Sequence, residues 1–300
     1  MKRILYTLAL ATIFAACSGG DSIDAIGTAD PNNTNANTNT TSNKYAARYE
    51  HPAINDSDVF LTYTTRESGK EQVTYSVSYN TTRRHARWIA FTFEGGNKAT
   101  NWNRNDWKKT EWKGDPWDYA PELPAEDQMD SSRGIYSIYG LSGYDRGHLV
   151  ASYDRLYSQD ANRQTFYSVN MSPMRSTFNQ DGPWNKLETK INNRSYGWAV
   201  TSDILYVVKG ATIREGEYDV KNTLTIPKKY FMALVRQKNN SYYGIAFLLG
   251  HNNNTGGNLS DYAMSIDELE EATGIDFFCN LPDKLENTLE SSKDLKAWNL

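Results

Sequence analysis

The residue types that could do chemistry are concentrated in two short segments. The first, Tyr144–His148, brings an aspartate, an arginine, a glycine and a histidine together in that order. The second runs from Phe166 to Glu188 and supplies amide and carboxylate side chains. Hydrolysis of a phosphodiester needs an activated water, neutralisation of the phosphate charge and a stabilised leaving oxygen. An imidazole, a guanidinium and oxygen ligands for a hard metal ion could supply these functions, so the two segments favour that chemistry.

Four residues of the first segment have a role that suits their type. His148 is the natural general base, because an imidazole titrates near neutral pH. Gly147 permits a sharp or left-handed turn, which could aim the ring into a groove. Arg146 can pair with phosphate oxygens as a planar fork. We expect Asp145 to be structural and to fix either Arg146 or the backbone of the turn. The remaining histidines are expected to be ordinary core or surface residues: His51, His85 and His251.

The second segment contains the candidate metal ligands. Asn179 is the candidate direct ligand, because Mg²⁺ takes oxygen ligands and keeps several of its waters. Glu188 could hold some of those waters, and Asn170 could orient His148 or bond the phosphate. Taken singly, asparagines are turn formers and Glu188 would be an ordinary exposed helix residue. Only their ordered grouping with the first segment favours the functional interpretation.

Several spaced motifs together resemble one known family. They are Asp145–His148, then Phe166–Pro173, then Phe178–Gln180 followed by Trp184–Glu188. In this order they are similar to the DNA/RNA non-specific endonucleases, the ββα-metal nucleases, and the similarity extends over nearly all of the chain from about Tyr45. The resemblance implies an α+β fold with a central, mostly antiparallel sheet flanked by helices.

The resemblance also implies a role for each motif residue. His148 would be the general base, Arg146 would contact phosphate, and Asn179 would be the direct ligand of Mg²⁺ or Mn²⁺. Glu188 would bind the metal through water. The implied substrates are both DNA and RNA, cut with little sequence preference, and the implied products carry 5′-phosphates.

The family uses a further, upstream arginine that stabilises the transition state. Arg104, within Asn103–Trp107, is the best match in this chain. Arg87 is a weaker candidate, because it opens a predicted strand.

One departure from the family pattern concerns the spacing between Asn179 and Glu188, which contains one extra residue. On an unbroken helix, a step of nine residues would turn these side chains to nearly opposite faces. Pro183 would also interrupt such a helix. Either the helix therefore begins at Pro183 with Asn179 in the preceding loop, or a bulge restores the facing.

The elements that must position these residues are mainly strands. Runs rich in β-branched and aromatic residues predict strands at Val59–Thr64, Val73–Tyr79, Arg87–Phe93, Ile204–Val208, Tyr230–Arg236 and Tyr242–Leu249, the last two forming a hairpin. Apolar stripes and capping signals predict helices at Pro183–Ile191, from Ser265 to about Gly274, and at Asp283–Lys296. Strands with helices inserted between and after them are typical of the α+β class.

The first 17 residues are predicted to be a targeting segment. Lys2 and Arg3 precede a short apolar core, residues 4–14, which is too short to span a bilayer as a stable helix. Small residues then lead into Cys17, which resembles a bacterial lipoprotein signal with Cys17 as the lipidated N-terminus and membrane anchor. The alternative is an ordinary secretory signal cut nearby. In both cases we expect export, and the lipoprotein interpretation predicts an outer-membrane location facing the periplasm or the cell surface.

Composition divides the rest of the chain into two parts. Residues 18–45 are rich in Asn and Thr and are predicted to be a flexible tether. Residues 46–300 are predicted to be one nuclease domain with a substantial core. Cys279 would have no disulfide partner if Cys17 is lipidated or removed, and we expect it to pack as a small apolar residue. The oligomeric state is open, a homodimer included.

The net charge of −4 argues weakly against a protein that coats nucleic acid, but an enzyme needs only a local basic groove. Basic residues between positions 83 and 113 alternate with four tryptophans, and the strip could be either such a groove or a solvated surface over buried rings. Two other functions therefore remain open. One is a lipoprotein that binds nucleic acid or polysaccharide without turnover, and the other is a toxin-like nuclease paired with an immunity protein.

Overall fold

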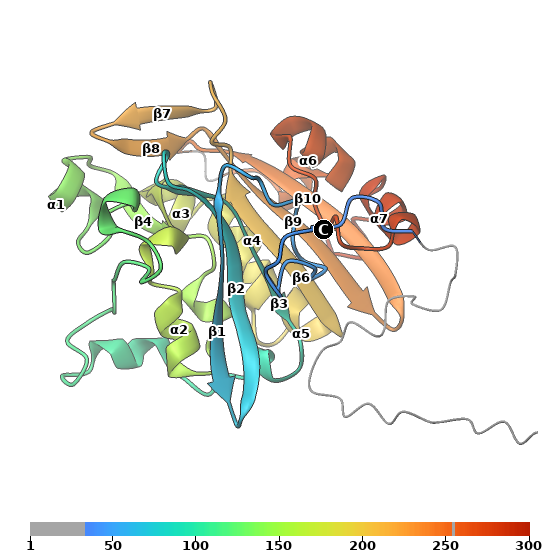
Figure 1. The fold of residues 1–300 in the computed structure, drawn as a ribbon, viewed down its shortest axis with the longest axis horizontal. Coiled ribbons are helices and arrows are strands. Elements are labelled where there is room, and N and C mark those ends of the chain that lie inside the picture. The colour runs from blue at the N-terminus through green and yellow to red at the C-terminus, as the bar shows by residue number, and fades with distance from the viewer. Residues whose placement is uncertain (1–33, 254–255) are drawn as a thin grey trace, which may run out of the picture.

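A computed structural model describes residues 34–253 and 256–300, in which a twisted sheet lies between helices (Figure 1). All neighbouring strands of this seven-stranded sheet are antiparallel, so the predicted fold class is confirmed. The strand order is β1 (Val59–Glu67), β2 (Lys70–Asn80), β3 (His85–Phe93), β6 (Ile204–Ala211), β9 (Lys229–Lys238), β10 (Ser241–Gly250) and β11 (Ala263–Met264). Each predicted strand falls within one of these elements.

The sheet is buried on both faces, and the sequence of β3 explains why. Side chains alternate along a strand, so Trp88 and Ala90 enter one core cluster while Ile89, Phe91 and Phe93 enter the other. Fully burying one such aromatic side chain stabilises the fold by about 1.5–3 kcal/mol. A strand with apolar residues on both of its faces therefore requires a covering layer on each face.

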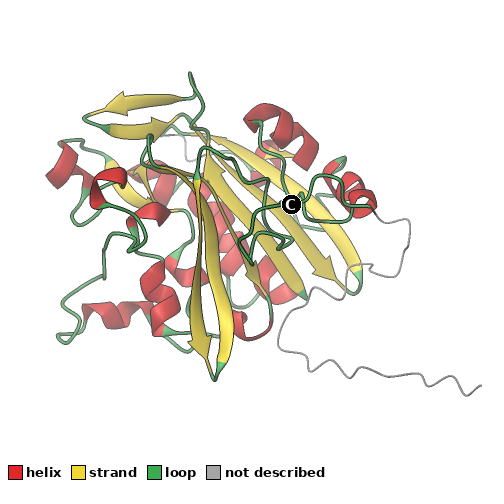
Figure 2. Cartoon of the chain, in the orientation of Figure 1, coloured by secondary structure: helices red, strands yellow, loops and turns green. Residues whose placement is uncertain are grey.

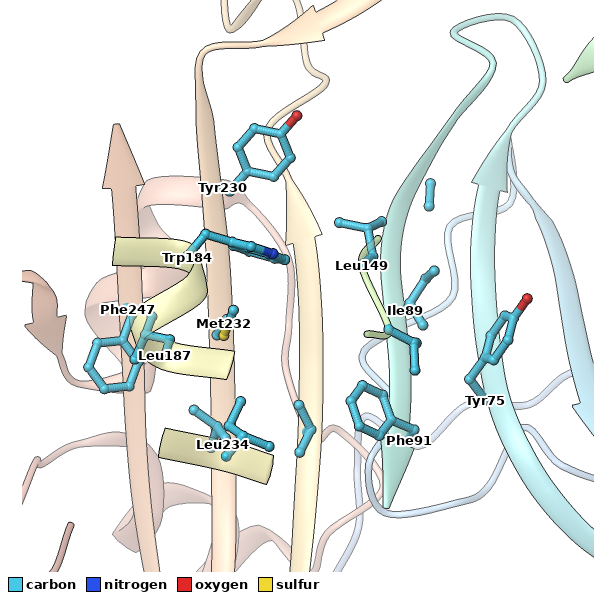
Figure 3. Close-up of a cluster of buried hydrophobic side chains, with 14 of the residues drawn as sticks. Tyr75, Ile89, Phe91, Leu149, Trp184, Leu187, Tyr230, Met232, Leu234 and Phe247 are labelled. Carbon is cyan, nitrogen blue, oxygen red and sulfur yellow. The ribbon is translucent and has the colours of Figure 1, made fainter. Parts of the chain in front are cut away.

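Helices α4 (Pro183–Asn192) and α5 (Trp198–Thr201) cover the face that Phe91 enters. Figure 3 shows Trp184 and Leu187 of α4 against Met232 of the sheet, within this core cluster. The opposite face is covered by α6 (Ile266–Thr273) and α7 (Asp283–Glu290), whose apolar residues enter the second cluster.

The remaining α-helices and strands lie mostly beside the β1 end of the sheet in this view (Figure 2). They are the helices α1 (Ile135–Tyr139), α2 (Gln159–Gln164) and α3 (Ser176–Gln180), the two-stranded ribbon β4 (Tyr144–His148) and β5 (Met171–Arg175), and the hairpin β7 (Tyr218–Lys221) and β8 (Leu224–Pro227).

The prediction of a last helix reaching Lys296 is wrong, because α7 ends at Glu290. Ser291 and Ser292 follow directly, and serine favours caps and turns over helix interiors. The Asp294 carboxylate then accepts hydrogen bonds from the backbone N–H groups of Lys296 and Ala297, which offers the chain a turn in place of helix.

The described part of the predicted tether, residues 34–45, lies against the domain. Asn35 donates to the backbone oxygen of Asn280 at 2.7 Å, and the backbone N–H of Asn39 donates to the Asn280 side chain at 2.9 Å. Amide side chains thus attach a segment that has little apolar surface to bury. Residues 1–33, including the predicted signal and Cys17, lie outside the described residues.

Two further findings concern residues 34–253 and 256–300. No helix in this part of the chain has both the length and the apolar character needed to span a bilayer. Cys279 is fully buried and free, and burial raises the pKa of its thiol well above the usual range. Its packing is that of a small apolar residue, as expected.

Candidate active site

The segment that was expected to form a turn, Tyr144–His148, is strand β4. It pairs antiparallel with β5, with His148 opposite Met171. The turn prediction is therefore wrong, and Gly147 does not supply a left-handed backbone. A Cβ atom at Gly147 would lie 2.4 Å from the side chain of Met174, so the glycine provides space for close packing across the ribbon.

Hydrogen bonds attach this ribbon to the main sheet. Nε2 of His85 in β3 lies 2.6 Å from the hydroxyl of Ser172 in β5, and that hydroxyl lies 2.6 Å from the hydroxyl of Tyr230 in β9. All three side chains are buried. The ribbon is therefore held on the face of the sheet that α4 covers, through buried hydrogen-bonding groups.

Arg146 and His148 lie on the same face of β4, because they are two residues apart. Trp117 contacts both: the guanidinium carbon of Arg146 lies 3.7 Å from the centre of its ring, and the His148 ring centre lies 5.4 Å away. Phe166 packs edge-on against His148, with ring centres 5.1 Å apart. Aromatic rings therefore fix the orientation of the imidazole.

Arg104 belongs to the same group. Its guanidinium forms a bidentate ion pair with Asp115. Nη1 donates to Oδ1, and Nη2 donates to Oδ2 at 2.8 Å. Its guanidinium carbon also lies 4.9 Å from the centre of the Phe166 ring, and the same ring contacts His148. The structure therefore brings Arg104, Arg146 and His148 together around Trp117 and Phe166.

The imidazole of His148 is neutral at physiological pH. Burial lowers its pKa to about 3, and the positive charges of Arg104, Arg146 and Lys209 act in the same direction. Its Nε2 atom is buried and has no hydrogen-bond partner among the described residues. A general base requires an unprotonated imidazole with a ring nitrogen that is free to accept a proton, and His148 meets both conditions.

Asn170 holds the backbone that follows His148. Its Oδ1 accepts a hydrogen bond from the Val150 N–H at 2.8 Å, while its Nδ2 donates to the carbonyls of Val150 and Thr165. The side chain is 0% exposed. Of its two expected roles, this arrangement favours positioning the His148 strand, since the amide is committed to backbone groups and does not reach the surface where a phosphate would bind.

Asp145 lies on the other face of β4 and contacts α3. Its carboxylate accepts hydrogen bonds from Ser176 at 2.8 Å, from Asn179 at 3.0 Å and from Gln180 at 2.7 Å. The expectation that Asp145 fixes Arg146 is therefore wrong, because adjacent residues of a strand point to opposite faces. Arg146 donates instead to the carbonyl oxygen of Ser131 at 2.9 Å.

The contact with Asp145 determines which side-chain atom of Asn179 is left to bind a metal ion. A carboxylate only accepts hydrogen bonds, so the amide nitrogen must face it. The amide oxygen of Asn179 accepts no hydrogen bond from the described residues. Asn179 thus offers the hard oxygen that a Mg²⁺ or Mn²⁺ ion prefers.

The extra residue between Asn179 and Glu188 is absorbed by a break between two helices. Asn179 lies in α3, and α4 begins at Pro183 as its first residue. This confirms the first of the two predicted solutions, except that Asn179 lies in a short helix of its own and not in a loop. The two side chains therefore do not share one helical phase.

Glu188 contacts a lysine that sequence reasoning missed. Its Oε1 lies 3.1 Å from Nζ of Lys209 in β6, and the same Nζ lies 3.2 Å from Oδ2 of Asp154. Lys209 is 0% exposed. The signal was present in the sequence, because a lysine interrupts the otherwise apolar run of β6, and a buried lysine requires paired carboxylates.

The charges of this group influence one another and the base. Burial raises the pKa of Glu188 to about 7, while Lys209 acts to lower it. Burial also acts to lower the pKa of Lys209, but Asp154 and Glu188 outweigh it, so the ammonium stays charged. Its charge reaches His148 as well. The Glu188 group and the His148 group therefore belong to one electrostatic region.

The strip of basic and aromatic residues is not one continuous surface. Arg87, the weaker candidate for the upstream arginine, is paired through two bonds with Asp58. His85, Trp88 and Trp107 are buried. The alternation of β3 thus directs much of the strip into the cores.

In this site, a two-stranded ribbon that carries the histidine is followed by a helix that carries the asparagine. A sequence model of the DNA/RNA non-specific endonuclease family matches residues 56–284. The chain belongs to this family. It is therefore an enzyme that hydrolyses phosphodiester bonds within nucleic acids.

Named relatives agree with this assignment. The chain is 28% identical to a nuclease of Nostoc sp. over 233 residues, covering 73% of this chain and 76% of that one. It is 26% identical to the nuclease of Serratia marcescens over 232 residues, covering 72% and 77%. Among solved structures, an EndoG in complex with EndoGI superposes with a TM-score of 0.57 at 21% identity, covering 75% and 89%, which shows a shared fold.

Proposed function

We propose that this endonuclease depends on a divalent metal ion, Mg²⁺ or Mn²⁺, and cuts DNA and RNA alike to leave 5′-phosphates. The observation that supports the proposal most directly is the pair of uncommitted atoms in the site. One is Nε2 of His148, and the other is the amide oxygen of Asn179, which Asp145 orients. The first suits a base, and the second suits a hard cation.

The donor set fits Mg²⁺ or Mn²⁺. Such ions keep several waters and are often bound by few protein groups. Asn179 would be the direct ligand, and Glu188 would hold metal-bound waters. The ion pair with Lys209 fixes the Glu188 carboxylate, as expected for a residue that orients ligands without binding the ion itself. When bound, the ion would polarise the phosphate and stabilise the leaving oxygen.

The protein's own groups would activate the water and offset the phosphate charge. His148 accepts a proton from the attacking water at Nε2, and its lowered pKa means that the ring is unprotonated at neutral pH. The guanidinium of Arg146, held over Trp117, and that of Arg104, held by Asp115, supply positive charge that pairs with phosphate oxygens. Their fixed partners mean that little reorganisation is needed during the reaction.

A plasmid-degradation assay tests the proposal. The chain from Ser18 onward, which keeps every described residue, would be compared with His148→Ala and Asn179→Ala, each with Mg²⁺ or Mn²⁺ and with EDTA. We expect cleavage that requires the metal and both side chains, with thermal melting to confirm that the variants fold. Cleavage in EDTA would refute metal dependence. Salt-sensitive DNA binding without cleavage by folded wild type would instead indicate a binding protein.

The chemistry of the product ends is tested separately. Products with 5′-phosphates should be joined by a DNA ligase directly, and should accept a label from polynucleotide kinase only after phosphatase treatment. Single-stranded RNA and DNA of the same sequence should both be degraded. Ends that need a kinase before ligation would contradict the proposed direction of bond cleavage.

We infer from the sequence that the enzyme is an exported lipoprotein of the outer membrane, facing the periplasm or the cell surface and anchored through Cys17. The supporting features are the basic residues, the apolar core and the small residues before Cys17. Labelled palmitate should be incorporated into the wild type and not into Cys17→Ser. Incorporation into both would refute this anchor.

A further inference from the structure

Three carboxylates meet between α6 and α7. Asp267 and Glu270 lie on α6, Glu290 lies on α7, and one ligand oxygen from each lies within 4.8 Å of the others. The cluster is remote from the nuclease centre, because α6 and α7 cover the opposite face of the sheet from α4. Nothing in the proposed reaction uses these residues.

The buried member of the cluster points to a missing ligand. Glu290 is only 6% exposed, and its Oε1 atom has no hydrogen-bond partner in the described part of the chain. Burying a carboxylate without a partner is costly, and buried charges are normally paired or bind a metal. No lysine or arginine within residues 34–253 and 256–300 forms an ion pair with Asp267, Glu270 or Glu290.

Neighbouring carboxylates increase the free-energy cost of burying a charged Glu290. Glu286 on α7 and Asp276 in the preceding loop are close enough to act on Glu290 electrostatically. Burial raises the pKa of Glu290 to about 10, and the charge of Glu270 acts in the same direction. A hydrogen bond of 2.7 Å from the Phe277 N–H holds Glu270 in place. The carboxylates are thus fixed in a region that lacks positive charge.

We propose that Asp267, Glu270 and Glu290 bind a divalent cation of the calcium type, which joins α6 to α7. Calcium accepts carboxylates in flexible geometry at about 2.3–2.6 Å, so two oxygens on opposite sides of one ion lie about 5 Å apart. The three oxygens of the cluster lie within 4.8 Å of one another, which is inside this span. Magnesium requires a smaller and more regular octahedron and keeps more of its waters, which makes it the poorer occupant.

The bound cation would stabilise the C-terminal layer of the fold. Helix α7 packs very closely on β10, where a Cβ atom at Gly244 would lie 2.4 Å from the carbonyl oxygen of Leu289. Next to the cluster, the side chain of Asn37 donates to both Asp276 and Glu286, so the N-terminal segment docks at the same place. A cation between the helices would therefore also favour docking of that segment.

Calorimetric titration with Ca²⁺ tests the proposal. The chain from Ser18 onward would be stripped with EDTA, desalted and titrated in the Asn179→Ala background, which removes the proposed catalytic ligand. We expect one site for Ca²⁺ and weaker binding of Mg²⁺. Glu290→Gln should weaken Ca²⁺ binding about tenfold or more, since affinity follows the number of charged ligands. Glu271→Gln, an exposed neighbour on α6, is the matched control and should bind as the parent does.

Thermal melting provides a second measurement that does not depend on nuclease activity. Saturating Ca²⁺ should raise the Tm of the parent and of Glu271→Gln by about 3 °C or more, but not that of Glu290→Gln. In EDTA, Glu290→Gln should be at least as stable as the parent, because glutamine is neutral whereas the buried Glu290 must first take up a proton. Absence of Ca²⁺ binding to the parent, or unchanged binding and Tm response in Glu290→Gln, would overturn the proposal. Plasmid cleavage at the wild-type rate by Glu290→Gln in the chain that keeps Asn179 would separate this site from the nuclease centre.

Discussion

The side-chain amide of Asn179 donates a hydrogen bond of 3.0 Å to the carboxylate of Asp145, which joins α3 to β4. Asp145 is one strand position from Arg146 and three from His148, so one short strand presents the proposed base and the proposed phosphate-binding cation on one face and orients the proposed metal ligand from the other. The aspartate of the segment therefore acts on the asparagine and not on its arginine neighbour.

Replacing Asp145 should impair metal use more than folding. In Asp145→Ala the amide of Asn179 loses its acceptor and can rotate, so its oxygen is no longer held in the binding orientation. We expect kcat/KM to fall about 10–100-fold, the usual effect of losing a group that orients a ligand. Part of the loss should be recovered at high Mg²⁺ concentration. Initial rates of plasmid cleavage against Mg²⁺ concentration measure both effects.

Gln180→Ala is the matched control for this variant. It removes another hydrogen bond to the same carboxylate but leaves Asn179 and Asp145 in contact. Its rate and Mg²⁺ dependence should stay within about threefold of wild type. Equal losses in both variants would mean that Asp145 stabilises α3 as a whole and does not orient Asn179.

Removal of Lys209 should destabilise the whole domain. Lys209→Met would leave Asp154 and Glu188 buried without their shared cation, and breaking a buried pair typically costs about 3–5 kcal/mol. Urea denaturation measures this free energy of unfolding. Lys228→Met, at an exposed lysine with a long contact to Asp219, should cost less than about 1 kcal/mol.

A double variant separates stability from catalysis. Adding Glu188→Gln to Lys209→Met removes one of the two unpaired charges, so part of the lost stability should return. The nuclease rate should not return, because in the proposed mechanism Glu188 holds metal-bound waters. Recovery of activity together with stability would show that Glu188 acts only as the partner of Lys209.

The sequence predicted what depends on local pattern, and missed what depends on contacts between distant segments. The run Arg87–Phe93 defines its strand and both of its faces by composition and alternation alone. In contrast, a residue without a side chain is required at position 147 because Met174 packs against it across the ribbon. No residue near Gly147 in the sequence indicates this contact. The partners of Asn170 and Asp145 likewise depend on where β5 and α3 lie. Only Lys209 carried a local signal, a charge inside an apolar strand, that could have predicted its role.

The packing of Gly147 can be tested by adding one methyl group. Gly147→Ala would place a Cβ atom 2.4 Å from the Met174 side chain, which must then shift and disturb the strand that carries His148. We expect a loss of about 1–3 kcal/mol in the free energy of unfolding and a reduced cleavage rate. Gly134→Ala, where the added Cβ atom meets no atom within 4 Å, is the control and should be nearly neutral. Equal effects of the two substitutions would contradict the packing role.

The buried histidine that joins the ribbon to the sheet should make stability depend on pH. Burial lowers the pKa of His85 to about 4 from the ordinary 6.5, although its bond to the Ala86 carbonyl opposes this. Below pH 6.5 the unfolded chain therefore binds a proton that the folded chain does not. The contribution of His85 is fully present above that pH and is lost progressively as the pH falls toward 4.

A comparison with His85→Gln isolates this contribution, because all other titrating groups are common to both proteins and cancel. Glutamine does not titrate, so between about pH 7.5 and about pH 5 the wild type should lose about 2 kcal/mol more unfolding free energy than the variant. Urea denaturation at the two pH values measures the difference. If the two proteins show parallel pH profiles, then His85 has the same pKa in the folded and unfolded states, as an imidazole exposed to water would, and the attachment of the active-site ribbon through Ser172 must be different from the one described.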